Sequence, residues 1–131
     1  MDKKLKRVLV TGAAGFLGSH LAEKLAEMKH KVIGIDNMKG GYKDNIPKNI
    51  EFFNFDCCDL DKMKLVMKDV RVVYHCAATA HEGLSVFSPY HITKNNFLAS
   101  VSVSATKIFL SLEYQAGILC PHHNCLEMHQ G

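Results

Sequence analysis

The sequence predicts a parallel, doubly wound α/β sheet, and three observations indicate this class. Short runs rich in β-branched residues alternate with segments of helical periodicity, as in strand–helix–strand units. A glycine-rich turn joins the first such run to the first helical segment. The chain has 131 residues, which suits one domain rather than two. We therefore expect a single, incomplete sheet of about four to five strands.

Four runs are predicted to be strands, because each is dense in Val, Ile or aromatic residues. They cover residues 7–11, 31–36, 50–56 and 70–75. Parallel neighbours need a crossover of about a dozen or more residues, usually helical. The intervening segments are therefore expected to return the chain across the sheet.

The first helix follows the glycine-rich turn, because Leu17, Leu21, Leu25 and Met28 recur at helical spacing. A shorter helix is predicted over residues 61–68. Residues 37–49 and 81–89 are rich in polar, glycine or proline residues and are predicted to be loops.

The segment 89–114 admits two interpretations. Val101 to Ala105 alternates with period two, as an exposed strand would, whereas the apolar residues of the wider window suit a helix. We predict a helix, because a crossover is needed there. Gly117 is then expected to cap its C-terminus, and residues 118–120 to begin a fifth strand.

Composition excludes several function classes. Lys plus Arg number 16 and Asp plus Glu 13, so the net charge of +3 is too small to indicate nucleic-acid binding. No apolar run approaches the roughly 20 residues of a membrane helix, and the short apolar run after the basic N-terminus does not resemble a secretory signal. Five cysteines, an odd number, favour reduced thiols. We therefore expect a cytoplasmic protein.

The glycine-rich turn carries the strongest functional signal. Gly12 would allow the tight turn, Gly15 would let a diphosphate approach the backbone, and Gly18 would let the helix pack against the strand. The N–H groups that open the helix would then hold the phosphates. Alone, the same glycines could also form a purely structural turn. Their position between a strand and an amphipathic helix favours dinucleotide binding.

Asp36 ends the second predicted strand, 18 residues after Gly18. A carboxylate at this place can accept hydrogen bonds from both adenosine ribose hydroxyls. It would repel a 2′-phosphate, so NAD is favoured over NADP. The alternative is a solvated strand end.

The chain resembles a known family over residues 6–118. The resemblance rests on TGAAGFLGSHL (11–21), GIDN (34–37), FDCCDL (55–60) and HCAATA (75–80). These segments are similar to the NAD-dependent epimerase/dehydratase group of the extended short-chain dehydrogenase/reductases, including the spacing of the three glycines. The resemblance implies the NAD-binding Rossmann part of an oxidoreductase that acts on a nucleotide sugar, with a possible homodimer through the 89–114 helix.

The same resemblance implies a set of cofactor contacts. Gly12, Gly15, Phe16, Leu17 and Gly18 would line the diphosphate. Asp36 and Asn37 would meet the adenosine ribose, and Asp56 and Cys57 the adenine. Cys76, Ala77 and Ala78 would lie on the nicotinamide side, and Asn96 would brace the strand ends. The family's usual tyrosine within this stretch is replaced by Ile92, and the residues after Asn96 also differ.

The family's catalytic Ser or Thr and its later Tyr-x-x-x-Lys pair have no counterpart at the expected positions, so no catalytic residue is assigned. Tyr90 and Lys94 fit that spacing, but they precede the family's catalytic pair and are interpreted as surface residues. We expect a Rossmann domain over residues 1–118 and an unrelated or disordered tail over 119–131. Such a chain would be a truncated, alternatively terminated or frameshifted product.

The tail contains a cluster of possible metal ligands: Cys120, His122, His123, Cys125 and His129. Structural zinc sites usually pair their ligands at short, regular spacings, which this cluster lacks. We therefore predict no metal. His20, His30, His81 and His91 show no partner pattern and are predicted to lie on the surface.

Two other functions remain open at this point. The chain could be a catalytically silent NAD-binding module, or it could belong to the steroid-dehydrogenase or isomerase branch of the same superfamily, which shares these N-terminal motifs.

Overall fold

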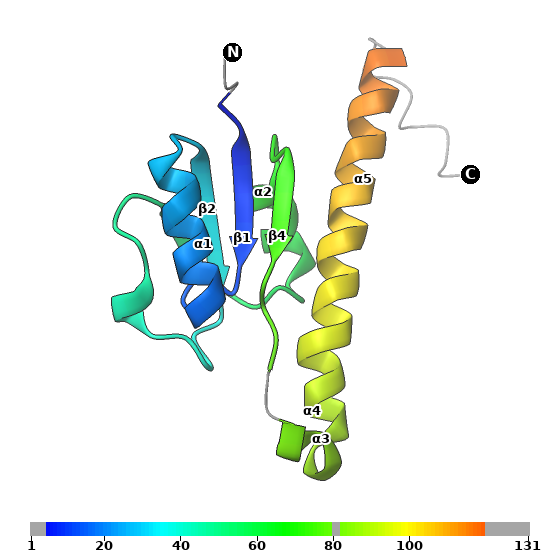
Figure 1. Ribbon diagram of the computed structural model, residues 1–131. Helices are drawn as coiled ribbons and strands as arrows, with labels where there is room; N and C mark the ends of the chain where they lie inside the picture. The colour runs from blue at the N-terminus through cyan, green and yellow to red at the C-terminus, as the bar shows by residue number, and fades with distance from the viewer. Residues whose placement is uncertain (1–4, 80–81, 120–131) are drawn as a thin grey trace, which may run out of the picture.

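Four parallel strands form the central sheet of the computed structural model, which describes residues 5–79 and 82–119 (Figure 1). The strands are β1 (Arg7–Thr11), β2 (Lys31–Asp36), β3 (Glu51–Asn54) and β4 (Val72–His75). Their order is β3-β2-β1-β4, and every neighbouring pair is parallel. The predicted parallel α/β sheet is therefore confirmed.

Helices cover both faces of this sheet. The helices of the structure are α1 (Phe16–Glu27), α2 (Leu60–Met67), α3 (Glu82–Phe87), α4 (Pro89–Thr93) and α5 (Ala99–Leu119), with a 3₁₀ turn η1 (Lys43–Asn45) and a π-helical turn η2 (Lys94–Leu98). In Figure 1, α1 lies in front of the sheet, α2 lies behind it, and α5 runs beside β4.

Alternate side chains of β1 enter two separate apolar cores. Val8 and Val10 share one core with Leu25 of α1. Leu9 shares the other with Met63 of α2 and Val103 of α5. Because successive strand side chains point to opposite faces, a strand covered on both sides must be apolar throughout. This explains why the run RVLVT shows no polar alternation.

Residues 89–119 form one continuous helical segment, made of α4, η2 and α5. The helix predicted over 89–114 is confirmed, and the alternative strand is excluded. The predicted cap at Gly117 is wrong, and so is the strand predicted to begin at Ile118, because α5 continues to Leu119. One interior glycine costs a helix only about 1 kcal/mol, which does not end a long one.

Two predicted loops contain helical turns. The segment 81–89 holds α3, and 37–49 holds η1. Tyr90 lies in α4, within the predicted helical segment. Residues 120–131, with the predicted tail cluster, lie outside the described residues. Within the described ranges, none of the helices is long and apolar enough to cross a bilayer.

Candidate functional site

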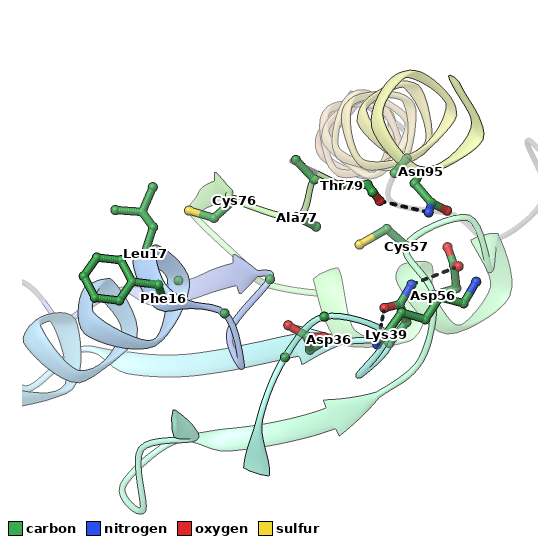
Figure 2. A pocket seen from close by; sticks show the side chains of 18 of the residues that line it. Phe16, Leu17, Asp36, Lys39, Asp56, Cys57, Cys76, Ala77, Thr79 and Asn95 are labelled. Carbon is green, nitrogen blue, oxygen red and sulfur yellow. Dashed lines mark hydrogen bonds between the residues drawn. The ribbon is translucent and has the colours of Figure 1, made fainter. Parts of the chain in front are cut away.

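A cleft of about 460 Å³ opens where β1, β2 and β4 end at the carboxyl edge of the sheet (Figure 2). All the residues predicted to hold a dinucleotide line it, except Asn96. The lining residues that the sequence did not indicate are Lys39, Gly40, Gly41, Phe55, Thr79, His91, Asn95 and Ala99. Figure 2 shows Phe16 and Leu17 towards one end of the cleft and Thr79 and Asn95 towards the other.

The glycine loop packs directly onto the residues that follow β4. Gly12 has a φ of +69°, and a Cβ there would lie 2.8 Å from the Ala77 nitrogen. A Cβ on Gly18 would lie 2.0 Å from the Gly12 carbonyl oxygen. A side chain at Gly12 would push the loop away from the segment after β4, and one at Gly18 would push α1 away from the loop. The first N–H groups of a helix have no partner within it, and the residues that begin α1, Phe16 to Gly18, line the cleft, so this end can hold an anion.

Asp36 is 9% exposed and ties the glycine loop to the end of β2. Its carboxylate accepts hydrogen bonds from the Ala14 N–H at 3.0 Å and from the Met38 N–H at 2.8 Å. It also lines the cleft, so its remaining lone pairs are available to accept from a ligand there.

The segment after β2 folds back onto the glycine loop. The Ala14 carbonyl accepts from the Tyr42 N–H at 3.0 Å and from the Asn45 amide at 3.2 Å. This return brings Lys39 and its two following glycines to the cleft wall. The Gly40-Gly41 pair was a possible signal for close backbone approach, although the sequence indicated only a loop.

Asp56 presents a carboxylate beside Asn37. Partial burial raises the pKa of Asp56, but hydrogen bonds from the Cys58 N–H at 2.9 Å and the Asn37 amide at 3.3 Å outweigh this effect and hold the pKa below its ordinary value. Asp56 is therefore ionised at neutral pH and acts only as an acceptor. An amine donor is the group that it would bind.

Two cysteines give the cleft its apolar walls. Burial, reinforced by the neighbouring Asp56 charge, raises the pKa of Cys57 to about 12. Burial also raises the pKa of Cys76. Both thiols are therefore neutral at physiological pH and behave as small apolar side chains. They are suited to packing against a ring rather than to nucleophilic chemistry.

Asn96 acts behind the cleft wall rather than in it. Its Oδ1 accepts from the Thr79 N–H at 2.7 Å, and its amide donates to the Thr79 carbonyl at 3.2 Å. The adjacent Asn95 donates to Thr79 Oγ1 at 3.0 Å. The turn η2 therefore presents two successive asparagines to one residue, and π-helical turns recur at functional sites. His91, predicted to lie on the surface, is exposed and also lines the cleft.

The tyrosine and lysine of the Tyr-x-x-x-Lys sequence do not line the cleft, and the tail cluster of possible metal ligands lies outside the described residues. Tyr90 is 78% exposed, and neither it nor Lys94 lines the cleft. Over residues 5–79 and 82–119, no group of three or more His, Cys, Asp or Glu side chains could hold a metal ion.

The model of the NAD dependent epimerase/dehydratase family matches residues 8–106. The chain belongs to this family. It is 42% identical over 97 residues to a putative UDP-glucose 4-epimerase of Methanocaldococcus jannaschii, covering 73% of this chain and 32% of the relative. It is 33% identical over 102 residues to UDP-glucuronic acid decarboxylase 1 of Danio rerio, covering 78% and 24%.

Solved structures agree with this assignment. A UDP-glucose 4-epimerase of Thermus thermophilus, in complex with NAD, superimposes with a TM-score of 0.70 and 35% identity, covering 76% of this chain and 33% of that one. The chain thus spans about a third or less of the length of these relatives. The resemblance predicted from the glycine loop and the strand-end motifs is confirmed.

Proposed function

We propose that this chain binds NAD and forms the cofactor-binding part of an enzyme that acts on a nucleotide sugar. The observation that carries the proposal is the cleft itself, where the glycine loop, two carboxylates and the segment after β4 converge. The relatives named as UDP-sugar epimerases and decarboxylases support the substrate class.

The residues present fit a dinucleotide. Gly12 and Gly18 keep the backbone of the loop open, so the diphosphate would meet the N–H groups that begin α1. Asp36 would accept from the adenosine ribose hydroxyls, with Asn37 beside it. Asp56 would accept from the adenine amine, with Cys57 against the ring.

The nicotinamide would lie at the β4 end, where Cys76, Ala77 and Ala78 offer small side chains. When bound, NAD supplies reversible hydride transfer. The residues of this chain bind and orient it. A catalytically silent NAD-binding module would have the same cleft, and the turnover experiment described in the Discussion separates the two functions.

The chain is expected to bind NAD more tightly than NADP, because the Asp36 carboxylate accepts from a ribose and repels a 2′-phosphate. Each lost hydrogen bond to a charged acceptor costs about 1.5–3 kcal/mol. Asp36→Ala is therefore expected to weaken NAD binding by about tenfold or more. Calorimetry with both cofactors measures this.

Asp44→Ala is the charge-matched control, because Asp44 is exposed on η1 and lies outside the cleft lining. It is expected to bind both cofactors as the original chain does. Equal affinity of the original chain for NAD and NADP would contradict the proposal, as would unchanged NAD binding in Asp36→Ala.

A further inference from the structure

A chain of hydrogen bonds runs behind the cleft wall and joins four segments. The Ala77 N–H donates to Thr11 Oγ1 at 3.2 Å, and Thr11 Oγ1 lies 2.6 Å from His75 Nδ1. On the other side of the ring, His75 Nε2 lies 3.0 Å from Ser100 Oγ. The Ser100 hydroxyl donates to the Asn96 carbonyl at 2.6 Å. One imidazole thus connects the end of β1 to α5 and η2.

The donors and acceptors in this series of hydrogen bonds allow only one consistent direction of donation. The Ser100 hydroxyl donates its hydrogen to the Asn96 carbonyl. The Ser100 oxygen must therefore accept from His75 Nε2–H. His75 Nδ1 then carries a lone pair and accepts from the Thr11 hydroxyl, whose oxygen accepts from Ala77. Every group is satisfied only when the imidazole is neutral and protonated on Nε2.

The segment 77–79 forms part of the cleft wall. The series of hydrogen bonds binds this segment at both of its ends. Thr11 holds the Ala77 N–H, and Asn96 holds the N–H and carbonyl of Thr79. We propose that His75 is a positioning residue for the cofactor, whose neutral, Nε2-protonated ring keeps this wall in its binding arrangement. The role rests on the proposed NAD-binding function of the cleft.

Protonation of His75 would reverse the direction of the hydrogen bond between His75 Nδ1 and the Thr11 hydroxyl. An imidazolium donates from both nitrogens, so Nδ1–H would meet the Thr11 oxygen and leave the Thr11 hydroxyl hydrogen without its acceptor. Because Thr11 is fully buried, that hydrogen cannot turn to water. Thr11 would then have to shift, and Ala77 is hydrogen-bonded to it.

The surroundings of His75 favour its neutral form. The groups that face the ring are the Thr11 hydroxyl from β1 and the Ser100 hydroxyl from α5, which in turn bonds the Asn96 carbonyl of η2; all three are uncharged. The adjacent Cys76 thiol is neutral, because burial raises its pKa. Burial alone lowers the pKa of His75 from 6.5, and none of the described carboxylates, Asp36 and Asp56 included, shifts it.

This lowered pKa fixes the sign of the pH dependence. The unfolded chain binds a proton at His75 more readily than the folded chain does. The contribution of neutral His75 to folding stability is therefore complete above pH 6.5 and is lost as the pH falls from 6.5 through the folded pKa. NAD affinity is expected to fall in the same window, because the apparent Kd rises in inverse proportion to the neutral fraction.

The first test needs no cofactor. Two-bond ¹H–¹⁵N correlation spectra of the full chain report the tautomer and the pKa of each imidazole. We expect the Nε2–H tautomer for His75 at about pH 8, and a pKa below that of an unperturbed histidine, about 6.5. An Nδ1–H tautomer, or a pKa at or above that value, would overturn the proposal.

The second test measures the Kd for NAD by calorimetry from about pH 8 to about pH 5, over the range in which the circular dichroism spectrum is unchanged. The Kd is expected to rise towards the acid end in proportion to 1 + 10^(pKa − pH), with the pKa of His75 taken from the first test. In His75→Gln, which keeps a side-chain N–H donor but does not titrate, the Kd for NAD should no longer change with pH over this range. His30→Gln is the control and should keep the original pH profile.

The outcomes separate the two proposals. Absence of NAD binding at about pH 8 would overturn the proposed function, and the positioning role with it. Binding that is independent of pH in the original chain, or a pH profile that persists in His75→Gln, would overturn the positioning role alone.

Discussion

Gly18 illustrates how single residues set the shape of the cleft. A Cβ there would lie 2.0 Å from the Gly12 carbonyl oxygen, and that oxygen belongs to backbone that cannot rotate away. The requirement is therefore steric and is independent of any ligand. It explains why the turn carries glycine at the point where α1 meets β1.

Gly18→Ala is expected to destabilise the chain by about 1–3 kcal/mol, the usual cost of overpacking. Urea unfolding followed by circular dichroism measures this. Gly40→Ala is the matched control, because Gly40 also lines the cleft but a Cβ there would meet nothing within 4 Å. Its stability should stay within about 0.5 kcal/mol of the original chain. Equal losses in the two variants would contradict the steric explanation.

At the scale of elements, a buried hydrogen bond joins α5 to a residue of the cleft wall. The Ser102 hydroxyl donates to the Cys57 carbonyl at 2.6 Å, and Ser102 is 8% exposed. The same helix covers the core residues of β1 and α2 through Val103. Packing and hydrogen bonding therefore act together to bring α5 against the segment that follows β3.

Ser102→Ala is expected to cost about 1–3 kcal/mol of unfolding free energy, because it leaves the buried Cys57 carbonyl without its donor. Ser104→Ala removes the same hydroxyl from an exposed position of the same helix and should change stability by less than about 0.5 kcal/mol. Chemical denaturation of both variants gives the comparison. A Ser102→Ala variant as stable as Ser104→Ala would show that the bond contributes nothing.

At the scale of the whole molecule, the cleft belongs to a chain that matches only part of the length of each relative. The matched segments cover 32% of the length of one relative and 24% of the length of another. General acid–base chemistry needs a proton-transfer group within about 2.6–3.2 Å of the substrate, directly or through one water. Tyr90, the tyrosine of the Tyr-x-x-x-Lys sequence, projects into solvent from α4.

The 131-residue chain is therefore expected to bind NAD without epimerising UDP-glucose or decarboxylating UDP-glucuronic acid. Chromatography of the sugar nucleotides after incubation with NAD detects either product, and calorimetry confirms that the cofactor is bound. Tyr90→Phe should bind NAD with unchanged affinity, because Tyr90 does not line the cleft. Turnover that disappears in Tyr90→Phe would contradict this expectation and assign the catalytic role to Tyr90.

Features that depend on neighbours along the chain could be predicted from the sequence. Apolar runs identified the four strands, periodicity identified α1 and α2, and the glycine spacing with Asp36 identified the edge of the sheet at which the cleft lies. These signals are readable because strand and helix geometry repeats over a few residues. Family membership followed from the same contiguous motifs.

Contacts between residues that are distant in the sequence depend on the tertiary structure. Thr11 and His75 are 64 positions apart, and Asn96 reaches Thr79 only because η2 turns it towards the segment after β4. His91, Lys39 and Ser100 carry no local pattern that marks them. A hydrogen bond between side chains depends on a position in space, and that position is set by how the helices pack on the sheet rather than by the residues beside them in the chain.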